Sequence, residues 1–262
     1  MSWLSDVEAE QVLDAPKDED HPLAQSPPVF NAPSVVLAAI AVLAALHFGR
    51  DLLSPEDDQW VILVGAFIPS RYSGDVLPGG SIAKVTSFVT HMGLHGDYAH
   101  LAVNCGWLLA FGSIVGRRIG AWRFVGLSLA TGIAGALAFL ASNWGLAAPM
   151  VGASGAISGL MGAAVRFMFS SLAMGGRDGG LLSPRMSLAE VFRDPRARLM
   201  IGSWVALNLF FGLVLGTIFS AGGIAWEAHL GGFAVGLLLF DWFDRQGPVT
   251  YDGSGTTQPP LQ

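Results

Sequence analysis

Residues Met150–Gly162 read MVGASGAISGLMG, and they place one serine, Ser154, between Gly152 and Gly155 at the start of an otherwise apolar stretch. Small residues at this spacing commonly let helices pack closely in membranes, so the run by itself is typical of helix packing. A hydroxyl in this position can also act as a nucleophile when a base lies beside it. The rest of the chain decides between these two interpretations.

The composition indicates an integral membrane protein. Of the 262 residues, 52% are hydrophobic and only 13% are charged, and the mean hydropathy is +0.52. An ordinary soluble domain carries roughly 25% charged residues. The single cysteine, Cys105, excludes an intrachain disulfide framework and a cysteine-based zinc site. The chain does not begin with a basic region and a short apolar core, so we expect no cleavable signal peptide.

The apolar segments predict an all-α membrane protein with a bundle of six transmembrane helices, because a spanning helix needs about 20 apolar residues. They cover residues 32–49, 98–116, 121–141, a helix that starts near 152, 199–220 and roughly 225–243. The run 60–72 is too short to span and reads as an interfacial or re-entrant piece of a long first loop. We expect a membrane core over residues 32–245, an acidic, Pro-rich cytosolic tail at 1–31 and a flexible tail at 246–262.

Basic residues in the short loops indicate the orientation. Arginines are concentrated after the second helix and after the fourth, whereas the turns at 142–151 and 221–225 hold none. Cytoplasmic loops carry the excess of Lys and Arg. We therefore expect both termini in the cytoplasm, and the second, fourth and sixth helices to begin at the outer surface.

Polar side chains occur at those three outer ends. His100 and Asn104 are four residues apart and share one face of the second helix, Ser154 lies in the first turn of the fourth, and His229 lies near the start of the sixth. Polar side chains at membrane depth are costly and suggest a function. The topology therefore predicts that these four side chains meet at one depth.

Their chemistry fits nucleophilic catalysis. A serine hydroxyl needs a base to take its proton, and a histidine such as His229 can do so near neutral pH. The resulting oxyanion needs hydrogen-bond donors, which His100, the Asn104 amide and the free N–H groups of the helix beginning at Ser154 can supply.

Glycines predict how the two helices meet. Gly232 and Gly236 lie below His229, and Gly155 begins a similar seam below Ser154. Facing seams of this kind would bring the imidazole within hydrogen-bond reach of the hydroxyl. Gly152 lets the backbone, a substrate and a neighbouring helix approach closely.

Three motifs, HGDYAHLAVN (95–104), GASG (152–155) and HLGGFAVG (229–236), resemble those of the rhomboid intramembrane serine proteases, and the resemblance covers roughly residues 35–245. It implies peptide-bond hydrolysis in or beside the membrane, a transmembrane protein as substrate, and no metal or organic cofactor. We expect no nucleic-acid partner. By position it implies these roles: Ser154 as nucleophile, His229 as general base, His100 and Asn104 as oxyanion hole, and His95 as a further histidine near the mouth of the site.

The chain departs from some members of that family at two places. The stretch VTSFVTH (85–91) lacks a Trp-Arg pair, and Ser158 stands where some members have a tyrosine against the catalytic histidine. The compact core favours a bacterial inner membrane.

Two alternatives remain open. One is a non-catalytic relative that binds membrane proteins. The other is a metal-binding membrane protein or transporter that uses His91, His95 and His100, although the glutamate of the zinc-protease signature is absent. We expect Glu227 to be a solvated residue that points away from the catalytic histidine, and Arg166 to reach the cytosolic headgroups.

Overall fold

The computed structural model describes residues 32–173, 183–215 and 225–245. Both expected tails, 1–31 and 246–262, lie outside this range, as does the end of the predicted helix 199–220. The described part contains helices and no strand, apart from one isolated bridge between Phe67 and Met150. The all-α prediction is therefore confirmed.

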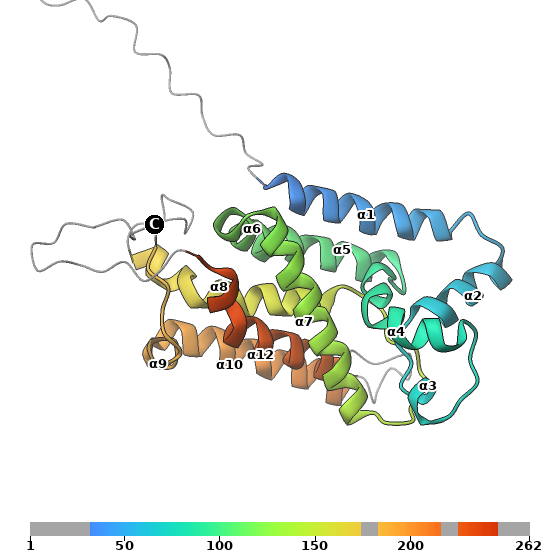
Figure 1. Ribbon diagram of the computed structural model, residues 1–262. Helices are drawn as coiled ribbons and strands as arrows, with labels where there is room; N and C mark the ends of the chain where they lie inside the picture. The colour runs from blue at the N-terminus through green and yellow to red at the C-terminus, as the bar shows by residue number, and fades with distance from the viewer. Residues whose placement is uncertain (1–31, 174–182, 216–224, 246–262) are drawn as a thin grey trace, which may run out of the picture. The chain divides into compact units, whose positions relative to one another are not determined.

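The predicted apolar segments are helical (Figure 1). Their bounds are α1 (Ser34–Arg50), α5 (Tyr98–Trp107) with η2 (Leu108–Gly112) and α6 (Ser113–Ile119), α7 (Ala121–Ser142), α8 (Ser154–Ala173), α10 (Pro195–Leu209) with η3 (Phe210–Leu215), and α12 (Trp226–Phe243). The connecting segments hold α2 (Pro55–Gly65), α3 (Ser70–Ser73), α4 (Gly80–Thr90), η1 (His91–Gly93) and α9 (Leu188–Arg193).

By length and composition, two helices of the described residues could cross a membrane, Tyr98–Ile119 and Ala121–Ser142, and α1 is apolar but shorter.

The start of α10 shows how a cap moves a helix boundary. The carboxylate of Asp194 accepts hydrogen bonds from the backbone N–H groups of Arg196 (2.8 Å) and Ala197 (3.2 Å), and Pro195 occupies the first helical position. An aspartate cap and a proline at this position both favour helix initiation. The helix therefore begins four residues before residue 199, where the apolar pattern alone predicted its start.

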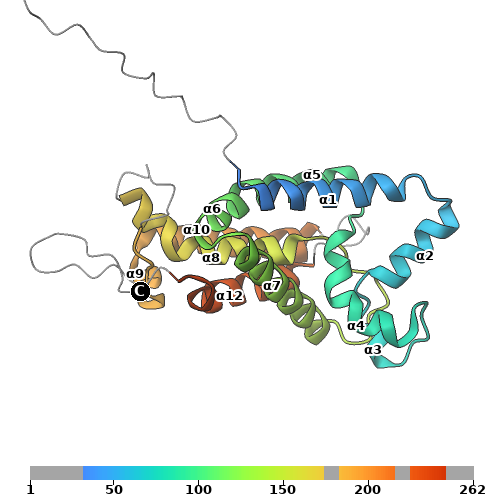
Figure 2. The same cartoon turned by 45° about the horizontal axis from the view of Figure 1, so that its top comes forward.

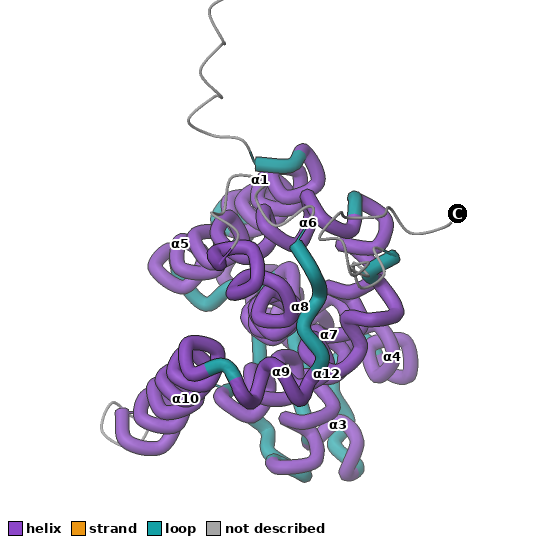
Figure 3. Tube along the Cα trace, turned by 90° about the vertical axis from the view of Figure 1, so that its left-hand side faces the viewer, coloured by secondary structure: helices purple, strands orange, loops and turns teal. Residues whose placement is uncertain are grey.

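The central helix is α8. All its residues from Gly155 to Phe167 are buried, and Figure 3 shows α8 enclosed by the other helices of the bundle. A helix that is apolar on every side belongs in an interior. Figure 1 and Figure 2 show α7 crossing beside α8 and α12.

Glycines allow α8 and α12 to touch backbone to backbone. A methyl group at Gly232 would overlap the carbonyl oxygen of Gly155, and one at Gly236 would overlap the carbonyl oxygen of Gly159. On α7, a methyl at Gly135 would lie 2.7 Å from the Ala228 carbonyl oxygen. The three helices consequently approach more closely than helices with side chains at these positions could.

Arg166 does not reach the headgroups, so that expectation was wrong. Its side chain is 2% exposed, and it donates to the carbonyls of Met186 and Leu237 at 2.8 Å each and to Asp241 at 2.6 Å. Because α8 is surrounded by other helices, the guanidinium is satisfied inside the protein. Asp241 also pairs with Arg185 at 3.0 Å, so α12 can continue past this acid to Phe243.

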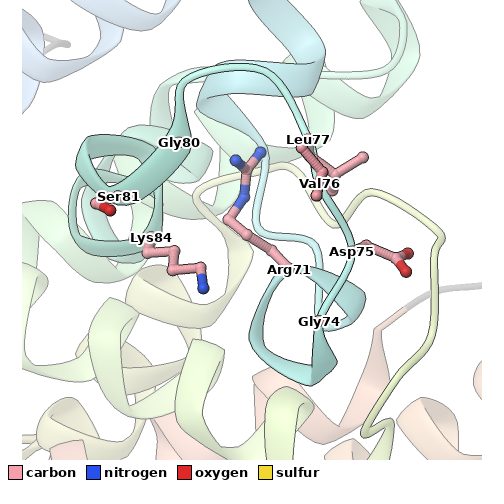
Figure 4. A pocket seen from close by; sticks show the side chains of 8 residues that line it. All are labelled: Arg71, Gly74, Asp75, Val76, Leu77, Gly80, Ser81 and Lys84. Atoms are coloured by element: carbon pink, nitrogen blue, oxygen red, sulfur yellow. The ribbon is translucent and has the colours of Figure 1, made fainter.

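The first loop is held together by a buried arginine. Arg71 is 1% exposed and donates to the carbonyl oxygens of Pro78, at 2.7 Å, and Leu63. Figure 4 shows it beside a cavity of about 220 Å³ that Lys84 also lines. Within the predicted interfacial run, α2 ends at Gly65 after 11 residues, which is too short to span a bilayer.

Substitution of Gly236 by alanine tests the glycine seam. The added methyl would overlap the Gly159 carbonyl, and overpacking a tight contact costs about 1–3 kcal/mol. We expect a lower free energy of unfolding and a lower midpoint in thermal unfolding in mild detergent. Gly202→Ala on α10 is the matched control, since nothing lies within 4 Å of its new methyl. Equal midpoints for the two variants would contradict the seam.

Candidate active site

Ser154 is presented by a sharp turn at the start of α8. Gly152 has φ +118°, a conformation that residues with a side chain rarely adopt, and its N–H donates to the His91 carbonyl at 2.9 Å. The turn makes Ser154 the first residue of α8. Its hydroxyl and backbone N–H therefore lie at the positive end of the helix dipole.

His229 lies in the first turn of α12 and reaches Ser154. Its Nε2 is 2.7 Å from the Ser154 Oγ, a normal hydrogen-bond distance between residues 75 positions apart. The contact lies directly beside the glycine seam, because Gly232 is one turn from His229 and faces Gly155. The structure thus brings together the serine and the histidine that the sequence singled out.

The second ring nitrogen of His229 has a partner that the sequence analysis did not predict. Nδ1 is 2.7 Å from the Oδ1 of Asn208 on α10. Asn208 stands in the apolar run WVALNLFFG (204–212). A polar residue at membrane depth suggests a function, so the sequence did contain a signal that could have identified Asn208. Its place explains how the histidine is held although Ser158 stands where some members of the resembled family have a tyrosine.

His100 packs against the turn that presents the serine. A methyl at Gly152 would lie 2.8 Å from both Cε1 and Nε2 of the His100 ring. The Gly96 N–H points to His100 Nδ1 over a long 3.5 Å. Asp97 caps α5 by accepting from the His100 backbone N–H at 2.7 Å. His100 therefore places its Nε2 beside the Ser154 turn.

Asn104 and His95 lie near His100 in different roles. Asn104 is buried, and its amide nitrogen donates to the His100 carbonyl at 2.9 Å, which leaves its second N–H for another acceptor. His95 is fully buried, and its ring centroid lies 5.1 Å from that of His100. Its backbone carbonyl accepts from Arg50 at 2.8 Å, so the segment before α5 is tied to α1.

The alternative metal site has no geometric support in the described residues. The Nδ1 of His91 forms a hydrogen bond with the Ser87 carbonyl oxygen at 2.8 Å. Within the described ranges, no group of three or more His, Cys, Asp or Glu side chains is placed to hold a metal ion. Glu227 is half-buried rather than solvated, and it accepts from the Asn143 amide at 3.1 Å instead of contacting His229.

Comparison with known proteins identifies the family. The family model of the rhomboid domain matches residues 83–244, which include the serine, the histidine and the Asn208 contact. The chain belongs to the rhomboid family. Rhomboids are integral membrane proteins, most of them intramembrane serine proteases that act on membrane proteins, and some members are inactive. No curated protein matches this rhomboid chain. Membership confirms the resemblance and the membrane location inferred from composition.

Alanine at Gly152 tests the turn beneath the serine. The methyl would both strain the backbone at φ +118° and press on the His100 ring. We expect the labelling rate of Ser154 by a fluorophosphonate to fall at least tenfold, about the effect of 1.4 kcal/mol. Gly120→Ala is the control, because Gly120 also has positive φ, +76°, but open space around it. Equal labelling of the two variants would show that contact with His100 is immaterial.

Two buried histidines of the first loop predict a pH-dependent stability. Burial lowers the pKa of His91 and of His95 to about 4, whereas the unfolded chain protonates near 6.5. Between these two pH values the unfolded state therefore binds more protons than the folded state. The free energy of unfolding has its full value above pH 6.5 and falls as the pH drops toward 4. Thermal unfolding from pH 8 to 4.5 measures this loss. His91→Gln should flatten the profile, and an unchanged profile would contradict the assignment.

Proposed function

We propose that this rhomboid is an intramembrane serine protease that hydrolyses peptide bonds in or near transmembrane segments of other membrane proteins. The observation that carries the proposal is the 2.7 Å contact between the Ser154 hydroxyl and the His229 imidazole. A serine becomes an effective nucleophile when a base at this distance takes its proton.

The reaction follows from the geometry. His229 Nε2 takes the proton while Ser154 Oγ attacks the scissile carbonyl carbon and forms a tetrahedral oxyanion. The Ser154 N–H, His100 Nε2–H and the Asn104 amide are the proposed donors to that oxyanion. The intermediate then collapses, His229 gives its proton to the leaving amine, and an acyl-enzyme remains. Water, deprotonated by His229, then attacks the acyl carbonyl; the bond to Ser154 Oγ breaks, His229 returns the proton to the serine, and the second product leaves. No metal or organic cofactor enters these steps.

The supporting residues act through position. Gly152 shapes the turn under the serine, Gly155 with Gly232 and Gly236 permits the contact between α8 and α12, and His95 fills the space behind His100. Each of these roles concerns packing, so substitutions should act by displacing the dyad.

The proposed topology has six spanning helices, both termini in the cytoplasm and the dyad near the outer leaflet, in a bacterial inner membrane. The cluster of Arg166, Arg185 and Asp241 supports this orientation, because it lies at the opposite ends of α8 and α12 from the dyad. A substrate helix must unwind before cleavage, since its own hydrogen bonds and side chains shield each peptide bond.

Cleavage of a model transmembrane substrate in liposomes tests the function. We expect wild type to cleave, and Ser154→Ala or His229→Ala to lower kcat by at least about 10³-fold, because either change removes the activated nucleophile. A fluorophosphonate should label wild type and leave Ser154→Ala unlabelled.

Ser158→Ala provides the matched control, because Ser158 is the next serine on α8, is buried, and lies one turn below the dyad. It should retain both cleavage and labelling. A wild-type protein that binds the substrate but neither cleaves it nor reacts would be a non-catalytic rhomboid instead.

A further inference from the structure

The orientation of the Asn208 side chain is fixed by a backbone carbonyl. Its Nδ2 donates to the Trp204 carbonyl oxygen at 2.9 Å, one turn earlier on α10. A carbonyl can only accept, so the amide must turn its NH₂ group toward Trp204. Its Oδ1 then faces His229, 2.7 Å from Nδ1.

This orientation determines the tautomer of the histidine. Because Oδ1 can only accept, Nδ1 of His229 carries the hydrogen and donates it. In a neutral imidazole the other nitrogen, Nε2, is then the acceptor. Nε2 is the atom 2.7 Å from the Ser154 Oγ, so the hydroxyl donates to it. A general base needs this arrangement.

We propose that Asn208 is a positioning residue, which holds His229 in the tautomer and orientation that deprotonate Ser154. The inference rests on the proposed function and deepens it. In soluble serine proteases an aspartate plays this part, and its exchange for asparagine lowers kcat about 10⁴-fold because the wrong tautomer results. Here the Trp204 carbonyl takes the amide N–H, so an asparagine can accept from the imidazole.

Contacts one turn before and one turn after Asn208 place it at the same height in the bundle as His229. Four residues before it, the Trp204 ring stacks on Phe233 of α12 with centroids 4.5 Å apart and planes at 22°. Four residues after it, a methyl on Gly212 would overlap the ring of Trp226. The partners on α12 run in the reverse direction, so the two helices are antiparallel. Asn208 is therefore held at the level of His229 by an aromatic contact on each side.

The acceptor and the dyad are carried by different helices. Ser154 and His229 stand on α8 and α12, which are joined through the glycine seam, whereas Asn208 stands on α10. The other face of α10 and η3 is open, since Leu207, Phe210 and Phe211 are exposed. A movement of α10 away from α12 would withdraw the acceptor and release the imidazole to the other tautomer.

The test compares two substitutions of similar size, Asn208→Leu and Asn208→Asp, in the full-length protein in liposomes. Leucine keeps the branched shape and the number of side-chain heavy atoms, is somewhat bulkier, and removes the acceptor. We expect its kcat to fall about 10- to 100-fold with KM unchanged. This loss is larger than that caused by removing one neutral hydrogen bond and smaller than that caused by enforcing the wrong tautomer. Ser203→Ala, an exposed change on the same helix, is the control and should match wild type.

Aspartate restores an acceptor and adds a charge. We expect Asn208→Asp to recover most of the kcat lost in the leucine variant. A carboxylate beside the imidazole favours its protonated form, so the acid limb of the rate profile should move to higher pH by about one unit or more. The shift of this limb reports that position 208 contacts the imidazole, and the recovered kcat reports that the imidazole needs an acceptor there. Wild-type kcat in the leucine variant, or equal losses in both variants with no pH shift, would overturn the inference.

A spectroscopic measurement needs no variant at Asn208. Side-chain ¹⁵N spectra of wild type, compared with those of His229→Ala, identify the resonances of His229. We expect a protonated Nδ1 and an unprotonated Nε2 at neutral pH, and the reverse pattern would overturn the inference. Failure of the protease proposal looks different, because wild type would then neither cleave the substrate nor react with the fluorophosphonate, whatever the tautomer of His229.

Discussion

The fold and the candidate site both depend on contact between the backbones of α8 and α12. At Gly155 with Gly232, and at Gly159 with Gly236, a single methyl group would overlap a carbonyl oxygen of the facing helix. In a membrane the lipid tails are as apolar as the side chains, so helices associate through close packing rather than through a hydrophobic driving force. The seam supplies that packing, and it sets the distance between the hydroxyl and the imidazole.

The dyad and the buried arginines find their partners at opposite ends of the bundle, by different means. At the dyad end the partners are neutral: a hydroxyl, an imidazole, an amide and a backbone carbonyl. At the other end the partners are charged, with Arg118 and Asp244 paired at 2.9 Å and each 1% exposed. Buried charges are tolerated only when they are paired and hydrogen-bonded. The neutral set leaves the imidazole free to take and return a proton, as the proposed reaction requires.

The imidazole of the proposed base is held on two sides, and the helices on these two sides differ in how fully they are buried. Its Nε2 side faces α8, which is buried from Gly155 to Phe167, and its Nδ1 side faces α10, whose other face is exposed. Catalytic competence would thus depend on a helix that is not part of the central packing. On this proposal, the position of α10 would be physically connected to the reactivity of Ser154.

The sequence by itself determined the all-α membrane class, the starts of the predicted helices within a few residues, and the serine and histidine that lie in contact. Periodicity, charge distribution and glycine spacing act along one helix, so the sequence reports them directly. Tertiary structure decided the rest. Arg166 was expected at the headgroups, but α8 is enclosed and Asp241 with two carbonyls satisfies it inside. Asn208 could not be assigned either, because its partner depends on the antiparallel register of two helices, which aromatic contacts set between residues distant in the chain.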